Sequence, residues 1–252
     1  MAIRLIDPTY IPKNIVKELE GFHAIFSSCE YLEQILETER LSEIADELNA
    51  ICEMDGVIGY HYTRAYRDDI LNSGLLVSQG DDRRKEFLRT QGHRFSREQR
   101  ERISTYWDSY FSGQQSAVRD GRIWFNFTLI ALAGGGADRL LTYYGGESIY
   151  MPLTRDAELS DVLCEIGEPM VIECLLEAKW LRTFSQSPWG RIWLSSYHLL
   201  INPEALQWDV DAYVKQNIPA HNILRIKATT RCLGTRSSWR ISNEEESCNN
   251  MQ

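Results

Sequence analysis

Apolar residues recur at spacings of three and four along the first part of the chain, with charged residues between them. Between residues 12 and 54 these positions are Leu32, Ile35, Leu36, Leu41, Ile44, Leu48 and Ile51. This period predicts amphipathic helices, and Gly56 follows where a left-handed residue can end the last one. We expect residues 1–55 to form a helical N-terminal segment, arranged as a helical hairpin.

The pattern changes after residue 56, where short runs rich in β-branched and aromatic residues begin. Such runs, bounded by Gly and Pro, predict strands. The predicted strands are "VIGYHYT", "RIWFNFT", "GESIYMPL", "PMVIECLLEA", "GRIWLSSYHLLI" and "NILRIKATT". A short helix closed by Gly74 follows the first strand, and a short helix with a glycine-rich break, Gly134–Gly136, follows the second. No repeat of fixed period is visible.

Polar residues dominate 81–118, which predicts a helical insertion between the first two strands. Strands and helices do not alternate regularly, so the sequence predicts an α+β fold rather than a doubly wound sheet. We therefore expect one α+β domain over 56–242. The tail 243–252, "NEEESCNNMQ", has no apolar pattern to bury in a core and is expected to be disordered.

Composition places the chain among ordinary globular proteins, with 43% hydrophobic and 25% charged residues. The net charge of −9 argues against a dedicated nucleic-acid-binding protein. Two tracts differ: residues 81–102 carry eight basic and five acidic residues, and 225–240 carry five basic residues and no acidic one. A solvated surface and a path for a polyanion both explain such tracts. Arg83, Arg84, Lys85 and Arg94 are the residues that a polyanion would contact.

The six cysteines are scattered and include no Cys-x-x-Cys pair, so we expect thiols and no metal site. No apolar run reaches the length of a membrane-spanning helix. The opening "MAIRLIDPTYIP" lacks the apolar core of a signal peptide. These features predict a cytoplasmic protein without a membrane partner.

Three local features carry candidate chemistry. They are His61-Tyr62-Thr63 on the first strand, Gly145-Gly146-Glu147 before a predicted strand, and "IPAHNILRI" near the end. Taken singly, each has a structural explanation: a strand histidine is usually a hydrogen-bonded core residue, and a glutamate after two glycines is usually a solvated turn residue.

Together and in this order, the segments resemble the ADP-ribosyltransferase superfamily, in its His-first branch of diphtheria-type toxins and poly(ADP-ribose) polymerases. Members of that branch have a strand with His-x-Thr, His-x-Ser or His-x-Gly, then an aromatic strand, then a strand with one essential Glu. Here "GYHYT", "RIWFNFT" and "GGESIY" match them, over roughly residues 56–230. The resemblance implies a split β-sheet core, and is greatest to the toxins of bacterial toxin–antitoxin and phage-defence systems.

The resemblance also implies the ligand and residue roles, with NAD as the ADP-ribose donor and no metal. Glu147 would stabilise the oxocarbenium ion that forms at the nicotinamide ribose, which is the need that a glycosidase carboxylate meets. His61 would bind the adenosine-side ribose, the backbone at Tyr62 the nicotinamide amide, and Thr63 the strand end or NAD. Four aromatic residues qualify to stack on nicotinamide, namely Phe125, Phe127, Tyr143 and Tyr144.

The chain departs from the family pattern in its second motif, which has phenylalanines and Asn126 where a tyrosine is usual. Glu173 in "VIECLLEA" is an alternative catalytic carboxylate, because a mid-strand carboxylate needs a reason for its burial. Alternation with apolar neighbours instead permits a position on the solvent face. Tyr197 and His198 are assigned to packing.

The expected activity is transfer of ADP-ribose from NAD to a macromolecule, with RNA or single-stranded DNA favoured slightly over protein because of the basic tracts. One alternative is a catalytically silent module that binds a nucleotide or a partner protein. Another is a tRNA 2′-phosphotransferase-like enzyme, for which Arg64 and Arg67 are present but a clear second histidine is not. A toxin would also have an antitoxin protein as partner.

Overall fold

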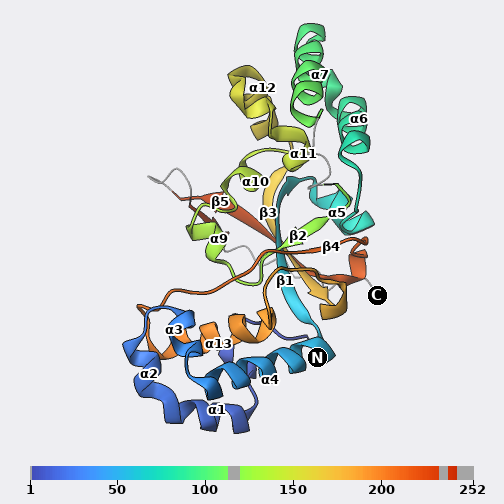
Figure 1. The fold of residues 1–252 in the computed structure, drawn as a ribbon. Helices are drawn as coiled ribbons and strands as arrows, with labels where there is room; N and C mark the ends of the chain where they lie inside the picture. The colour runs from blue at the N-terminus through green and yellow to red at the C-terminus, as the bar shows by residue number, and fades with distance from the viewer. Residues whose placement is uncertain (1, 113–119, 233–237, 243–252) are drawn as a thin grey trace. The chain divides into compact units, whose positions relative to one another are not determined.

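The computed structural model describes residues 2–112, 120–232 and 238–242, and the chain divides into two compact units (Figure 1). Unit 1 comprises Met1–Tyr60, Trp124–Ile130 and Cys174–Tyr213; unit 2 comprises His61–Ile123, Ala131–Glu173 and Val214–Gln252. The division passes through strands, whereas the boundary predicted from the sequence lies between residues 55 and 56. The predicted tail, and the last part of the predicted insertion at 113–119, lie outside the described residues.

Helices make up most of unit 1 and gather together in Figure 1. Their bounds are α1 Lys13–Leu19, α2 His23–Ser28, α3 Leu32–Leu36, α4 Glu39–Asp55 and α13 Pro188–Ile201, with single 3₁₀ turns at Pro8–Tyr10, Glu20–Phe22 and Ala178–Trp180. The predicted N-terminal helices are confirmed, but they form four separate helices rather than one hairpin. Gly56 ends α4 at φ 82°, as predicted.

The prediction of a strand at "GRIWLSSYHLLI" is wrong, because this segment forms helix α13. Its apolar residues form a nearly continuous run, which is typical of a buried helix as well as of a buried strand. Pro188 at the first helical turn favours a helix start, and ten of the residues of α13 are buried. The periodicity alone could not distinguish the two structures.

Helices α4 and α13 pack together at a single glycine. A β-carbon on Gly190 would lie 1.8 Å from the carbonyl oxygen of Ala45 and 2.7 Å from the nitrogen of Asn49. The Asn49 side chain completes this crossing, since its Oδ1 accepts a hydrogen bond from the Trp189 nitrogen at 3.0 Å. The helices therefore meet backbone to backbone, which no larger residue permits.

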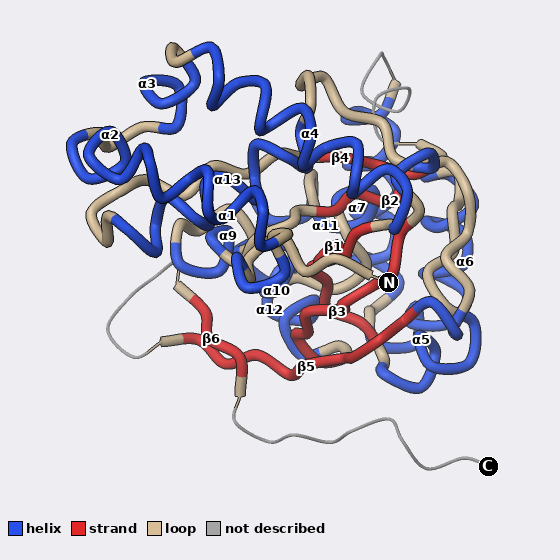
Figure 2. Tube along the Cα trace, turned by 90° about the horizontal axis from the view of Figure 1, so that it is seen from below, coloured by secondary structure: helices blue, strands red, loops and turns tan. Residues whose placement is uncertain are grey.

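Strands β1 Val57–Ala65, β3 Glu168–Leu176, β5 Ile223–Arg231 and β6 Trp239–Ile241 form one sheet in the order β1–β3–β5–β6. The predicted strands at the first three of these segments are confirmed, whereas β6 was not predicted. β5 and β6 are antiparallel, with Thr229 opposite Ile241 and Arg231 opposite Trp239 (Figure 2). Two shorter strands, β2 Ile123–Phe125 and β4 Ala212–Val214, form a separate two-stranded ribbon.

Seven further α-helices lie in the described residues. They are α5 Arg67–Ser73, α6 Gly80–Gln91, α7 Arg97–Phe111, α9 Ile130–Ala133, α10 Asp138–Thr142, α11 Glu147–Tyr150 and α12 Ala157–Glu165, with 3₁₀ turns at Gly92–Arg94, Leu153–Arg155 and Ala220–Asn222. Unit 2 has its own core, in which residues of α6 and α7 such as Phe87 and Trp107 pack with Leu159 and Leu163 of α12. The combination of helices with a curled sheet agrees with the predicted α+β class.

Candidate functional site

His61, Tyr62 and Thr63 lie in the second half of β1, as predicted. The side chains of His61 and Thr63 are half-buried, whereas Tyr62 is only 3% exposed. Arg64 fixes the end of this strand: its Nε donates a hydrogen bond to the carbonyl oxygen of Ile166 at 2.9 Å. Burial lowers the pKa of the Arg64 guanidinium from its ordinary value.

Two close backbone approaches define how β1 lies beside β3. A β-carbon on Gly56 would lie 2.9 Å from the Leu176 carbonyl oxygen, and one on Gly167 would lie 2.6 Å from the Ala65 carbonyl oxygen. Gly56 precedes β1 and Gly167 precedes β3, and at both positions a side chain would collide with the backbone of the neighbouring strand's end.

Glu173, the alternative catalytic carboxylate, is fully buried in β3. Its Oε1 lies 2.6 Å from Nζ of Lys227 in β5, and the Lys227 side chain is 27% exposed. The prediction that alternation could place Glu173 on a solvent face is therefore wrong. A buried carboxylate is tolerated when a cation neutralises it, and Lys227 supplies that cation. This arrangement explains Glu173 without a catalytic role.

The Gly145-Gly146-Glu147 segment forms a turn that begins helix α11, so the predicted strand "GESIYMPL" is wrong. Gly145 and Gly146 have φ angles of +85° and +75°, a conformation that side chains disfavour. These two residues reverse the chain and leave Glu147 exposed. The Gly145 nitrogen donates to the carbonyl oxygen of Arg64 at 3.3 Å, which holds the turn against the end of β1.

A hollow of about 280 Å³ lies beside Glu147 in unit 2. Its other lining residues are Gly135, Gly136, Asp138, Arg139, Leu140, Tyr150 and Met151. The structure thus gives Glu147 an open environment, and His61 is not among the described residues that line the hollow. The two predicted site segments are therefore joined by the turn at Gly145, and not by a cavity that both of them line.

Two tyrosines lie beside this turn. The rings of Tyr66 and Tyr144 are 5.8 Å apart between centroids, and both side chains are half-exposed. Arg83 donates to the Gly145 carbonyl oxygen at 3.4 Å, and Arg94 donates to the Tyr66 hydroxyl at 3.5 Å. Burial raises the pKa of the Tyr144 hydroxyl, which is therefore a neutral donor at physiological pH.

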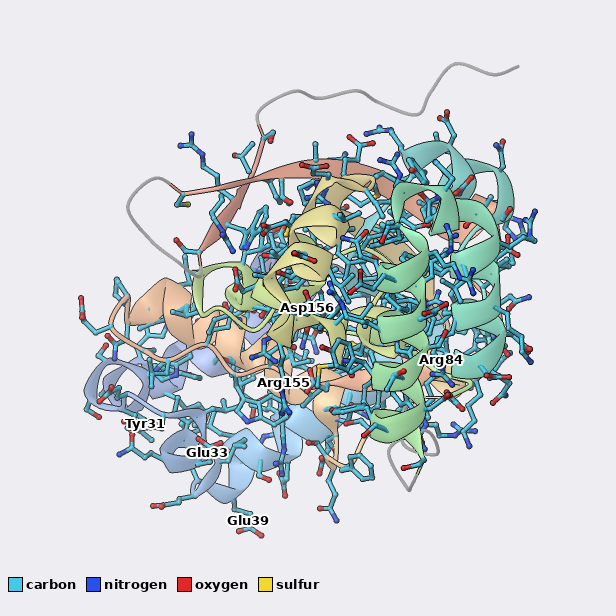
Figure 3. All side chains as sticks on the ribbon, turned by 90° about the horizontal axis from the view of Figure 1, so that it is seen from above. Tyr31, Glu33, Glu39, Arg84, Arg155 and Asp156 are labelled. Carbon is cyan, nitrogen blue, oxygen red and sulfur yellow. The ribbon has the colours of Figure 1, made fainter. Side chains whose placement is uncertain are left out.

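The four basic residues predicted to contact a polyanion fall into two pairs. Arg84 lies 4.4 Å above the Phe111 ring, between the α6 and α7 ribbons of Figure 3, and also 3.7 Å from Asp81. Lys85 pairs with the same aspartate at 2.6 Å. Neither Arg83 nor Arg94 forms an ion pair with another residue in the described part of the chain. Only these two remain available to an anionic ligand.

The phenylalanines predicted to bind the cofactor are buried in unit 1, where Phe125 is 2% and Phe127 0% exposed. The Phe127 ring packs on Trp189 with centroids 4.6 Å apart, so its role is in the core. Of the four rings predicted to stack on nicotinamide, Tyr143 and Tyr144 are half-exposed.

The other face of the same segment was missed. Alternation along β2 and the following residues places Trp124 and Asn126 opposite to Phe125 and Phe127. Across the ribbon, Asn126 Nδ2 donates to Asp211 Oδ1 at 2.7 Å, and the ring of Tyr213 lies 4.8 Å from that of Trp124. The signal for this face is the alternation in "WFNF"; the prediction used only the aromatic content of that segment.

Asp209 precedes this ribbon and has a structural role. Its carboxylate accepts hydrogen bonds from the nitrogens of Phe127, Thr128 and Val210 and from the Thr128 hydroxyl, at 2.6 to 3.0 Å. Burial raises the pKa of Asp209, and these four donors act against that rise. All of these groups belong to unit 1.

Comparisons with family models, with curated proteins and with solved structures find no match to this chain. In the described residues, no helix combines the length and the apolar character needed to span a bilayer. The same residues contain no group of three or more His, Cys, Asp or Glu side chains placed to hold a metal ion.

Proposed function

We propose that the protein is an NAD-dependent ADP-ribosyltransferase, built on a core of that superfamily's type. The observation that carries the proposal is the hydrogen bond from the Gly145 nitrogen to the Arg64 carbonyl oxygen. This bond joins the His61-Tyr62-Thr63 strand to the Gly145-Gly146-Glu147 turn, two segments far apart in the sequence that both resemble motifs of one family.

The chemistry assigned to these residues follows from the reaction. Cleavage of the bond between the nicotinamide nitrogen and ribose C1 sends its electron pair to the ring and leaves positive charge on the ribose. An ionised carboxylate close to the ribose stabilises that charge, and exposed Glu147 is accessible for this role, in contrast to Glu173. A nucleophile of the acceptor then bonds to C1 and loses its proton.

In the proposed site, His61 and Thr63 orient the dinucleotide from β1 with the backbone at Tyr62. Tyr144, on the adjoining turn, supplies an aromatic face. Arg83 and Arg94 beside the tyrosine pair favour a polyanionic acceptor, RNA or single-stranded DNA, because unpaired arginines with exposed rings bind phosphates and stack on bases. The biological setting that goes with this activity is a toxin with a neutralising antitoxin protein.

The test measures nicotinamide released from NAD by the purified chain and by three variants, with cell extract as the source of acceptor. Glu147→Gln and His61→Ala should each lower the rate about 100-fold or more, since removal of a transition-state contact has that size of effect. Glu165→Gln, an exposed glutamate at the end of α12, is the matched control and should leave the rate unchanged.

Two outcomes would count against the proposal. Full activity in Glu147→Gln would remove Glu147 from the site. NAD binding in calorimetry without nicotinamide release would instead indicate a silent binding module. Pretreatment of the extract with ribonuclease, deoxyribonuclease or protease, followed by transfer from radiolabelled NAD, identifies the acceptor class.

A further inference from the structure

A hollow of about 520 Å³ lies in unit 1, lined by residues of α1, of α13 and of the 3₁₀ turn at Pro8–Tyr10. We call it the α1–α13 groove. Its volume falls within the range of small-molecule sites, about 300–1,000 Å³. The groove therefore has the size of a site for a small ligand, and it is separate from the segments proposed to bind NAD.

The α13 side of the groove is apolar. Tyr197 and Leu200 are three residues apart in α13 and both line the groove, as expected for side chains on one face of a helix. The Tyr197 hydroxyl lies 2.8 Å from Nε2 of His23, so Tyr197 contributes its ring rather than its polar end. Leu200 is 64% exposed. A ligand with an apolar body would cover Leu200 and remove this surface from water, which stabilises the complex.

The α1 side of the groove carries two positive charges. Lys13, Val16 and Lys17 line it together, since spacings of three and four residues bring side chains to one face of a helix. Lysine side chains lay their apolar stems along such a surface and keep the ammonium group at its edge. Two like charges four residues apart repel each other, and an anion bound beside them would turn this repulsion into attraction.

The unpaired state of these two lysines stands out against the charge of their surroundings. Residues 1–55 contain twelve Asp or Glu and only four Lys or Arg. Arg40 pairs with three glutamates, and Arg4 donates a hydrogen bond to a tyrosine hydroxyl. Lys13 and Lys17 are exposed and form no ion pair with any residue that the structure describes. The unpaired cations of an acidic segment thus both lie at the same apolar groove.

The acidic residue of the lining, Glu20, lies toward the other side of the groove. Burial, and after it the nearby Glu20 carboxylate, raise the pKa of the Tyr197 hydroxyl, which places Glu20 close to Tyr197. We propose that the α1–α13 groove binds a free straight-chain carboxylate, with its apolar chain against Val16 and Leu200 and its carboxylate at Lys13 and Lys17. This inference does not rest on the proposed function.

The experiment is calorimetric titration of the full chain with octanoate and with octanamide, its neutral amide of nearly the same shape. Octanoate should bind about 5-fold more tightly, the effect expected of an exposed ion pair. Butanoate carries the same charge on a shorter chain and should bind about 10-fold more weakly than octanoate or worse, because it covers less apolar surface. Octylammonium, with the opposite charge, should bind more weakly than octanamide.

Variants assign the two parts of the ligand to residues. Lys13→Met combined with Lys17→Met should abolish the preference for octanoate over octanamide and leave the melting temperature unchanged. Lys179→Met combined with Lys215→Met removes two exposed lysines outside the groove and is the matched control, which should keep the preference. Leu200→Ser should weaken binding of octanoate and octanamide alike.

Equal affinity for octanoate and octanamide would overturn the inference, as would butanoate binding as tightly as octanoate. A preference for octanoate that survives in the Lys13 and Lys17 double variant would also overturn it, because the carboxylate would then bind elsewhere. Since the readout is equilibrium binding in the absence of NAD, none of these results depends on turnover.

Discussion

The two units satisfy their buried polar groups in different ways. In unit 1 the buried polar side chains bond mainly to the backbone: Asn49 accepts from the Trp189 nitrogen, and His198 Nε2 lies 3.0 Å from the carbonyl oxygens of Phe26 and Cys29. In unit 2 the fully buried Glu173 instead pairs with a charged side chain, that of Lys227. The two arrangements respond differently to substitution.

A bond to the backbone fixes geometry, because the acceptor cannot move without moving its helix. A pair of side chains can rearrange, and salt weakens its exposed members. Unit 2 also contains the predicted His61 strand, the glycine turn and the unpaired arginines. We therefore expect unit 1 to lose stability mainly through steric or backbone changes, and unit 2 mainly through changes of charge.

The largest expected effect comes from Gly190→Ala in unit 1. The added β-carbon would lie 1.8 Å from the Ala45 carbonyl oxygen, so α4 and α13 must separate. We expect a loss of about 3 kcal/mol in the free energy of unfolding, at the upper end for overpacking of a core. Urea denaturation measures the loss, and hydrogen exchange should show faster exchange in α4 and α13.

Gly21→Ala is the matched control, because no atom lies within 4 Å of a β-carbon at Gly21. This change should stabilise the protein slightly, by about 0.5 kcal/mol, since alanine loses less backbone entropy on folding. Equal destabilisation by both variants would show that the α4–α13 crossing is not as close as described.

Lys227→Met should produce the next largest effect, now in unit 2. It leaves the fully buried Glu173 carboxylate without its cation, at a cost of about 2 kcal/mol; the partial exposure of Lys227 keeps the cost below that of a fully buried pair. Combining it with Glu173→Leu should recover most of the stability. Failure of the double variant to recover would show that Glu173 has a role that the ion pair does not explain.

The smallest effect concerns pH and returns to unit 1. Burial lowers the pKa of His198, so the unfolded chain binds a proton at this residue more readily than the folded chain. Stability from neutral His198 is present above the ordinary pKa near 6.5 and decreases as the pH falls below it, by at most about 1 kcal/mol.

His198→Gln keeps a nitrogen donor for the Phe26 and Cys29 carbonyl oxygens but does not titrate. Its stability should change less between pH 7.5 and 5.5 than that of the parent chain, as measured by urea denaturation at each pH. His23, which pairs with the Tyr197 hydroxyl at 2.8 Å, remains in both chains and provides the common background. Identical pH dependence of the two chains would contradict the assignment.

The sequence predicted the elements whose local signals agree with their surroundings. Hydrophobic periodicity and the positions of glycine and proline predicted the β1 strand, the end of the helix at Gly74 and the N-terminal helices. The prediction failed where tertiary contacts determine the secondary structure. The sequence of α13 is equally compatible with a buried strand, and its helical form depends on contact with α4 at Gly190. Strands of three residues, such as β4 and β6, have too little pattern to be recognised.

The site was predictable in part. The sequence drew attention to His61 and to the Gly145-Gly146 turn, but not to the Lys227 partner of Glu173, which lies on another strand and has no local signal. It also could not show that Arg84 and Lys85 are held by Asp81, leaving Arg83 and Arg94. The face of the β2–β4 ribbon that carries Trp124 could have been predicted from the alternation in the sequence alone.

The division of the chain into interleaved segments has a consequence for protein synthesis. Helix α13 belongs to unit 1 but is translated after most of unit 2, because the chain passes between the units five times. While the ribosome is still adding these residues, α4 emerges without its partner and exposes the apolar surface on which α13 will pack. Folding of unit 1 must therefore wait until the last fifth of the chain is reached, and nascent chains are a target for chaperones until then.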